Sequence, residues 1–386
     1  MKQYAFFLLF LLTSVHVMKA QKRDVWEYGM DIPVYVDSIQ QSLTYPLAWR
    51  NSTPSSDFPS WKIMARTMVM RFMEPAPPRA AHWDMKIVAE EKRDGYKAQK
   101  VQFRLSRWYS VFAYILIPDG KGPFPAVNLL HDHGAHLYIG KEKMIAPIAE
   151  TYDVKADADD WAKKLYGGQF LGDYLASHGF VVFSIDAPLW GERGREEGVD
   201  RKKYDIIAGN MMMLGQNLCA YMHHDDIVST DFLASLPYVD SDRIGAAGLS
   251  MGAYRAWMLA AMSDNIKAAC AVCWMTTTGT QLTTLYGRRE NGGFANCIPG
   301  LRNYLDYPDI ASLAAPKPML FIAGSLDKLF PVKGVQDAFN IMRKVWTDAG
   351  APQNLTAVVE RQPHECNLGN QKAILDFLTR HLSADK

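Results

Sequence analysis

The pattern of hydrophobic and polar positions divides the chain into three parts with different periodicities. An almost continuous apolar run occupies residues 6–17. Up to about residue 78 the pattern is irregular and interrupted by prolines, with one helical stretch predicted at 60–73. Three β-rich runs follow at 83–88, 96–105 and 109–117, separated by turn residues that predict antiparallel hairpins.

From residue 126 onward, short apolar runs alternate with helical stretches, which is typical of parallel βαβ units. The predicted strands are 126–130, 180–185, 244–247, 268–273, 319–323 and 355–359. The predicted helices are 168–177, 206–235, 251–262, 335–348 and 370–381. This order predicts an α/β fold with a doubly wound, mostly parallel sheet that carries antiparallel strands from the N-terminal part.

The first twenty residues have the features of a secretory signal peptide. Lys2 supplies a positive start, the apolar run follows, and Ala20 is a small residue at a plausible cleavage point. The run is shorter than the roughly 20 apolar residues of a membrane span, and no cysteine for a lipoprotein anchor is near. We therefore expect a signal peptide at 1–20, a secreted or periplasmic protein without a membrane span, and a wrapping extension at 21–82 before the main domain.

Charge and cysteine content exclude several classes of function. The 42 basic and 41 acidic residues give a net charge of +1, without the basic excess expected of a nucleic-acid-binding protein. The five cysteines are too few and too scattered for a disulfide framework. Cys270 and Cys273 have redox-type spacing, but they lie within an apolar run and are interpreted as small buried side chains.

Ligands of such sheets bind beyond the carboxyl ends of the strands, so polar residues that follow strands are the candidates for chemistry. Ser250 lies in a Gly-Leu-Ser-Met-Gly sequence between a predicted strand and a predicted helix, the context of a nucleophile elbow. A serine nucleophile needs a base and a group that orients the base. His364 and Asp327 follow later strands and are the predicted base and acid. Glu365, adjacent to His364, is the rival acid.

Stabilisation of an oxyanion requires backbone N–H donors aimed at it. The N–H of Met251, at the start of the predicted helix, is the first candidate. The second is expected in the loop that follows the strand at 126–130, where we favour His133 over Gly134.

Two histidine-containing clusters have alternative interpretations. His131, His133 and His136 resemble zinc ligands in spacing, but Ala135 stands where metallo-hydrolases carry an aspartate, so no metal and no cofactor are predicted. The run His-His-Asp-Asp at 223–226 lies within a predicted helix and is interpreted as a solvated or hydrogen-bonded helix face.

Two further segments are candidates for substrate contacts. Trp190, Glu192 and Arg193 follow the strand at 180–185. The insertion at 277–309 is expected to form a lid, and its arginines would suit an acidic sugar. Its notable side chains are Tyr286, Arg288, Arg289, Arg302 and Tyr304.

With these residues the chain resembles a known family, the serine carbohydrate esterases of the α/β-hydrolase superfamily that are close to dienelactone hydrolases and acetyl xylan esterases. The resemblance runs through residues 94–96, 117–127, 131–134, 240–245 and 248–252, together with Asp327 and His364. It implies an α/β-hydrolase catalytic domain at 83–386 with a helical or loop lid, and the catalytic roles carry over to Ser250, Asp327 and His364. Relatives usually have glycine where this chain has Asp132.

The resemblance implies an esterified plant-type polysaccharide or oligosaccharide as substrate. Deacetylation is favoured, and demethylation of pectic uronates is the alternative on the same three residues. A non-catalytic glycan-binding protein on a hydrolase fold is the alternative from another class, because a fold does not fix a function.

Overall fold

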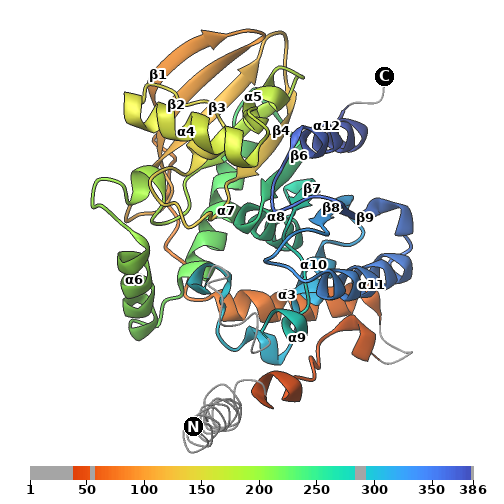
Figure 1. Ribbon diagram of the computed structural model, residues 1–386. Coiled ribbons are helices and arrows are strands. Elements are labelled where there is room, and N and C mark those ends of the chain that lie inside the picture. Colours follow the sequence, from red (N-terminus) through yellow and green to blue (C-terminus); the bar gives the residue numbers. More distant parts are fainter. Residues whose placement is uncertain (1–37, 53–56, 283–292, 384–386) are drawn as a thin grey trace, which may run out of the picture.

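A nine-stranded mixed sheet forms the centre of the protein in the computed structural model, which describes residues 38–52, 57–282 and 293–383 (Figure 1). The strand order is β1-β2-β3-β5-β4-β6-β7-β8-β9. The strands are β1 (Lys86–Arg93), β2 (Tyr96–Arg104), β3 (Ser110–Pro118), β4 (Phe124–Leu130), β5 (Val181–Ile185), β6 (Val239–Leu249), β7 (Ile266–Val272), β8 (Met319–Gly324) and β9 (Leu355–Glu360).

Pairing within the sheet changes from antiparallel to parallel at β5. Strands β1, β2 and β3 form an antiparallel meander, and β3 pairs antiparallel with β5. From β5 through β4 and β6 to β9 every pair is parallel. The predicted doubly wound sheet with antiparallel N-terminal strands is therefore confirmed.

Helices cover both faces of the sheet because the parallel strands are apolar on both sides. Val181 packs into one core with α3, α7, α8 and α11, while its neighbour Val182 packs into the other with α4, α5 and α12. From residue 57 onward, the described α-helices are α3 (Phe58–Met73), α4 (Tyr152–Leu165), α5 (Leu171–Ala176), α6 (Arg201–Met213), α7 (Leu218–Ala234), α8 (Met251–Met262), α9 (Thr278–Gln281), α10 (Tyr307–Ala311), α11 (Val332–Asp348) and α12 (Leu368–Leu382).

The single helix predicted at 206–235 is wrong, because the chain forms two helices there, α6 and α7. Gly215 adopts φ +72°, a left-handed conformation that ends a helix. The Asn217 side chain then accepts a hydrogen bond from the Ala220 N–H and caps the start of α7. As a result α6 projects from the edge of the molecule (Figure 1).

A strand and a further helix also differ from the prediction. The strand expected at 83–88 lies at Lys86–Arg93, because its register follows hydrogen bonding to β2 and not its own apolar residues, most of which are exposed. Helix α4 was not predicted, since its sequence is rich in aspartate. Its buried residues nevertheless form a stripe at helical spacing, at Val154, Ala158, Trp161 and Ala162.

The N-terminal segment lies against the α7, α10 and α11 side of the molecule. Helix α3 contacts α7 and α10. The Leu47 N–H donates to the Tyr304 carbonyl at 3.1 Å, and Arg50 forms an ion pair with Asp309 of α10. These contacts fit an extension that wraps the main domain, and the boundaries at 21–82 and 83–386 stay predictions.

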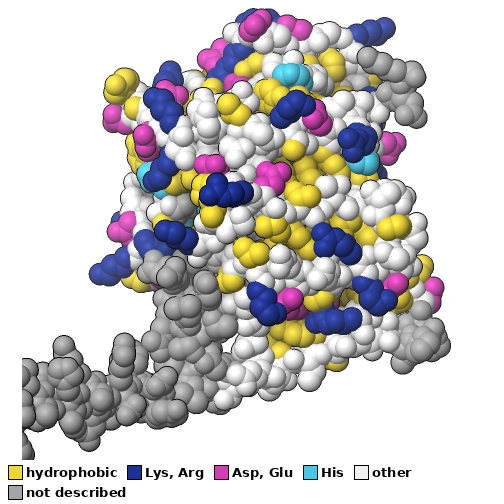
Figure 2. Space-filling view, turned by 45° about the vertical axis from the view of Figure 1, so that its right-hand side comes forward, with side chains coloured by type: hydrophobic (Ala, Val, Ile, Leu, Met, Phe, Trp, Pro, Cys, Tyr) yellow, Lys and Arg dark blue, Asp and Glu magenta, His cyan; other side chains and the backbone are white. Residues whose placement is uncertain are grey.

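Basic and acidic side chains are interspersed on the face shown in Figure 2, as expected for a net charge of +1. Among the described residues, no helix has both the length and the apolar composition needed to cross a membrane. The predicted signal peptide at 1–20 lies outside the described residues.

Candidate active site

Ser250 occupies a sharp turn between β6 and α8, in backbone angles that a side-chain-bearing residue rarely adopts. Its φ is +56° and its ψ is −124°. The turn fits because its neighbours are glycines: a Cβ on Gly252 would lie 1.7 Å from the Leu130 carbonyl oxygen, and one on Gly248 would lie 2.4 Å from the carbonyl carbon of Gly252. This strained strand-turn-helix geometry is the one expected of a nucleophile elbow, and the role of Ser250 as nucleophile stays a prediction.

Asp327 and His364 form a hydrogen-bonded pair. Nδ1 of His364 lies 2.6 Å from Oδ2 of Asp327, while Oδ1 of Asp327 accepts the Leu329 N–H at 2.8 Å. The imidazole ring of His364 stacks on Phe330 with the ring centroids 6.0 Å apart. The rival acid Glu365 has its carboxylate turned toward the side-chain amide of Asn367 instead.

Ser250 and His364 line one pocket of about 290 Å³. Its walls come from the loop after β4, the start of α6, the elbow, the segments after β7, β8 and β9, and the short helix near residue 296. The lining residues are His133, Gly134, Ala135, Arg201, Ser250, Met251, Trp274, Asn296, Leu329, Phe330 and His364. Asp327 lies behind His364, and its carboxylate is almost fully buried.

The expected oxyanion donors lie at this pocket. Met251 is the first residue of α8, and the N–H groups of a first helical turn have no partner within their helix. His133 lines the opposite side. Nδ1 of its ring accepts the Ala135 N–H at 2.9 Å, so the ring proton of the neutral form lies on Nε2. Burial and the nearby charges of Lys143 and Arg201 lower the pKa of His133 to about 3, which keeps the ring neutral.

The structure places Trp190, Glu192 and Arg193 behind the pocket wall and not among its lining residues. The Trp190 indole is buried and packs edge-on against His133. Glu192 pairs with Lys141 at 2.6 Å and with Lys100 at 2.7 Å. Arg193 pairs with Asp225 at 2.7 Å. These groups support the wall, because their polar atoms are already engaged with other parts of the protein.

The three histidines with zinc-like spacing have separate partners. Nδ1 of His131 donates to the Asp132 carbonyl, and its Nε2 accepts the Ala187 N–H, each at 2.9 Å. His136 binds Asp157 at 2.5 Å. Three carboxylates that are close enough together to hold a metal ion lie elsewhere, at Glu142, Glu150 and Glu192. The ammonium groups of Lys100 and Lys141 already bind these carboxylates.

The run at 223–226 is buried, so the prediction of a solvated face is wrong. The alternative prediction of a hydrogen-bonded face is confirmed for His224, Asp225 and Asp226 but not for His223, whose ring nitrogens have no hydrogen-bond partner among the described residues. His224 contacts the Met73 carbonyl at 3.0 Å. Asp225 accepts from Tyr109 at 2.6 Å. Asp226 accepts two hydrogen bonds from Arg255, at 2.9 and 2.6 Å, and this pair ties α7 to α8 beside the elbow.

Among the described residues of the expected lid, Arg302 and Tyr304 are not pocket-lining residues. Tyr286, Arg288 and Arg289 lie outside the described residues. The guanidinium of Arg302 is buried over the Tyr307 ring, 3.8 Å from its centroid, and the Tyr304 ring packs against Phe72.

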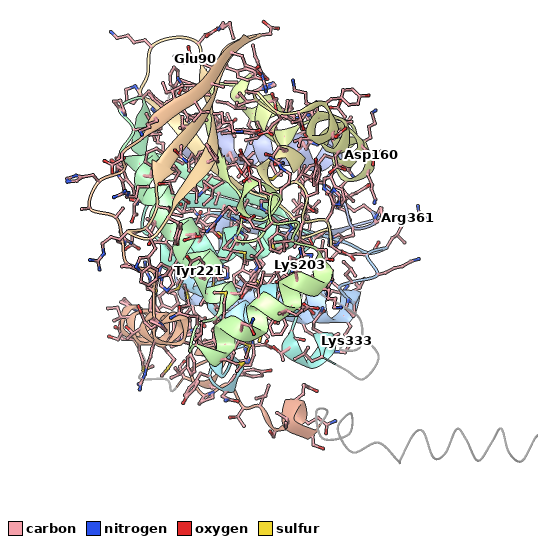
Figure 3. The ribbon with its side chains drawn as sticks, turned by 90° about the vertical axis from the view of Figure 1, so that its left-hand side faces the viewer. Glu90, Asp160, Lys203, Tyr221, Lys333 and Arg361 are labelled. Carbon is pink, nitrogen blue, oxygen red and sulfur yellow. The ribbon has the colours of Figure 1, made fainter. Side chains whose placement is uncertain are left out.

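Arg201, which the sequence analysis missed, is an arginine that lines the pocket. It is the first residue of α6, and the Asp200 side chain caps this helix by accepting the Lys203 N–H at 2.8 Å. Figure 3 shows α6, with Lys203 labelled, in front of α7, which carries Tyr221. The sequence signal for a helix that starts at Arg201 is the N-cap residue Asp200, but the prediction of one long helix at 206–235 did not use it.

Comparison with known proteins places this fold and site in a family. The model of the Abhydrolase family matches residues 12–364. The chain belongs to this family. "Putative hydrolase YtaP" of Bacillus subtilis (strain 168) is 30% identical over 241 residues, which cover 62% of this chain and 73% of that protein. The predicted membership of the α/β-hydrolases is thereby confirmed.

Solved structures support the same fold at low sequence identity. The crystal structure of a putative acetyl xylan esterase from Bacteroides fragilis NCTC 9343 has a TM-score of 0.66 at 20% identity, and the match covers 86% of this chain and 83% of that one. A glucuronoyl esterase from Solibacter usitatus has a TM-score of 0.60 at 13% identity and covers 88% and 97%.

Proposed function

We propose that this Abhydrolase family member is a serine carboxyl-ester hydrolase that acts on esterified polysaccharides or oligosaccharides and prefers acetyl esters. The observation that carries the proposal is the 2.6 Å hydrogen bond between Asp327 and His364, beside a pocket that His364 shares with Ser250 in its strained elbow. A nucleophile, a base and an acid that orients the base are the groups that a Ser-His-Asp triad uses for acyl transfer.

In the proposed mechanism His364 accepts the proton of the Ser250 hydroxyl as the oxygen attacks the ester carbonyl. The Met251 N–H and a donor from the loop after β4 stabilise the oxyanion of the tetrahedral intermediate. Collapse of the intermediate releases the sugar alcohol, which takes the proton from His364, and leaves an acyl-serine. Water, activated by the same imidazole, then hydrolyses the acyl-enzyme and releases the carboxylic acid.

The pocket walls support a carbohydrate ester with a small acyl group. Trp274 and Phe330 provide aromatic surface, against which the apolar face of a sugar ring can pack. The volume of about 290 Å³ is at the lower limit for small-molecule sites, roughly 300–1,000 Å³. The predicted signal peptide agrees with a polymeric substrate outside the cytoplasm.

Arg201 favours a second candidate, hydrolysis of a methyl ester on an acidic sugar. Among the described lining residues it is the one arginine, and none of the described ones is an aspartate or a glutamate. A cation in this position would attract neighbouring uronates of a pectic chain. The glucuronoyl esterase among the similar folds has a substrate of the uronate class in its name.

Product analysis separates the two candidates. Acetylated xylan, acetylated pectin and methyl-esterified pectic oligosaccharides would be incubated with the protein, and acetate and methanol would be quantified. Acetate release that disappears in Ser250→Ala supports the proposal. Methanol as the product of the pectic substrates, without acetate, would replace it by the second candidate, and turnover of neither class would leave the glycan-binding alternative.

A further inference from the structure

We propose that Lys143 is a positioning residue that orients the backbone donors of the oxyanion hole. This inference rests on the proposed function, because it concerns the loop opposite Ser250. It also explains how Asp132 is accommodated where related chains usually have glycine.

The ammonium group of Lys143 is fully buried and binds the backbone of the loop. Its Nζ donates to the Asp132 carbonyl at 2.9 Å and to the His133 carbonyl at 3.1 Å. The nearest carboxylate oxygen, Oδ1 of Asp132, is farther away at 3.5 Å. Oδ2 of Asp132 accepts from Tyr166 at 2.9 Å and from Trp161 at 3.2 Å. The shortest contacts of this buried cation are therefore with two successive peptide carbonyls.

Those two contacts fix the direction of two N–H groups. The peptide bonds from Asp132 to His133 and from His133 to Gly134 are trans, because the three cis bonds of the described chain all precede prolines. In a trans peptide the N–H points opposite to the C=O. With both carbonyls directed at Lys143, the His133 and Gly134 N–H groups point to the other side of the loop.

The other side of the loop is the pocket. His133, Gly134 and Ala135 line it, whereas Lys143 does not. Within residues 57–282 and 293–383, no hydrogen-bond acceptor is found for the N–H of either His133 or Gly134. Both groups are thus directed toward the pocket and remain available to an oxyanion. The Asp132 side chain points away, toward Tyr166 and Trp161.

The two peptides depend on Lys143 to different degrees. The His133 carbonyl also accepts from the Trp190 indole N–H at 3.3 Å and from the His136 N–H at 3.2 Å. The Asp132 carbonyl has one other donor, the adjacent His131 ring. Loss of Lys143 therefore releases mainly the peptide between Asp132 and His133, and the His133 N–H is the donor most affected. Gly134 stays in place, since the loop is pressed against Trp161, which would lie 2.3 Å from a Cβ at that position.

The test is Lys143→Met, assayed on an aryl acetate and on the matching thionoester. Loss of one oxyanion donor typically lowers kcat by about a hundredfold to a thousandfold, and we expect a loss in this range for the oxoester with KM changed by less than about threefold. Sulfur is a weak hydrogen-bond acceptor. The thionoester gains little from the donors, so its turnover should fall by less than about tenfold.

Lys317→Met is the matched control. Lys317 is a partly buried lysine whose Nζ also donates to two backbone carbonyls, those of Ala260 at 2.8 Å and Ser263 at 2.7 Å, at the end of α8 away from Ser250. Its loss removes the same kind of hydrogen bonds without touching the loop. The ratio of oxoester to thionoester turnover should remain at the wild-type value in this variant.

A double variant, Lys143→Met with Asp132→Asn, keeps the test decisive if the single variant fails to fold, because it leaves no uncompensated carboxylate. An oxoester to thionoester ratio lowered at least about tenfold in the folded protein supports the inference. An unchanged ratio, or an equal fall with Lys317→Met, overturns it. Absence of aryl acetate turnover in the wild type would instead refute the proposed function itself.

Discussion

Replacement of Asp327 by asparagine would test how the acid orients His364. Oδ1 of Asp327 accepts the Leu329 N–H at 2.8 Å, which fixes the plane of the carboxylate, and Oδ2 accepts from His364 at 2.6 Å. In Asp327→Asn the amide oxygen would retain the bond to Leu329. The NH₂ group would then face Nδ1 of His364 and donate to it.

The consequence is a change of the His364 tautomer, and the resulting loss of kcat can be predicted. Because Nδ1 of His364 would then accept a hydrogen bond, the ring proton would move to Nε2, which is the nitrogen that must take the serine proton. The same change in a Ser-His-Asp triad lowers kcat by about 10⁴, which corresponds to about 5.4 kcal/mol of transition-state stabilisation. We expect a loss of this size in Asp327→Asn, with KM nearly unchanged since the Asp327 carboxylate does not line the pocket.

The assay is the steady-state hydrolysis of an aryl acetate near neutral pH, with Glu365→Gln as the matched control. Glu365 is adjacent to His364 but contacts Asn367, so its neutralisation should change kcat by less than about threefold. Retention of kcat within about tenfold of wild type by Asp327→Asn, or an equally large loss in Glu365→Gln, would refute this reasoning.

Three further predictions concern the buried groups around the elbow. Arg255→Met should lower the free energy of unfolding, measured in urea, by about 3–5 kcal/mol, because it leaves the Asp226 carboxylate buried and unpaired. The double variant Arg255→Met with Asp226→Leu should recover most of the lost stability, and additive losses would contradict this. Burial and the Arg255 charge hold the pKa of His223 far below its usual value, so below about pH 6.5 the unfolded chain binds a proton that the folded protein does not. The free energy of unfolding of the wild type should therefore fall on acidification by up to about 1.4 kcal/mol per pH unit more than that of His223→Phe, and parallel pH profiles of the two proteins would argue against this. Gly252→Ala should abolish ester hydrolysis and lower the melting temperature, because its Cβ would lie 1.7 Å from the Leu130 carbonyl oxygen; a fully active variant would show that the elbow is less constrained than described.

Features with a local cause were predictable from the sequence. The elbow is encoded by two glycines around Ser250, and each glycine is required by a backbone contact within the strand-turn-helix unit or with the adjacent β4. Asp327 and His364 follow consecutive strands β8 and β9, which pair in parallel, so both side chains emerge at the same edge of the sheet. Sequence order and strand pairing together were sufficient to bring them together.

Features that depend on distant partners were not predictable. Arg193 turns inward because Asp225, on a helix that begins after a left-handed glycine, offers a buried carboxylate. Arg201 reaches the pocket because α6 is a separate helix that projects from the edge of the molecule. In the sequence Lys143 looks like an ordinary surface lysine, and only the folded structure shows the two backbone carbonyls that bind it.

Covalent labelling of the nucleophile tests the central claim most directly. The protein would be treated with an alkyl fluorophosphonate, and the labelled peptide would be identified by mass spectrometry while aryl acetate hydrolysis is followed in parallel. The account predicts one adduct per chain, on Ser250, formed in step with the loss of activity, and neither adduct nor hydrolysis in Ser250→Ala. Hydrolysis that persists in Ser250→Ala, or an inactivating adduct on another residue, would contradict it.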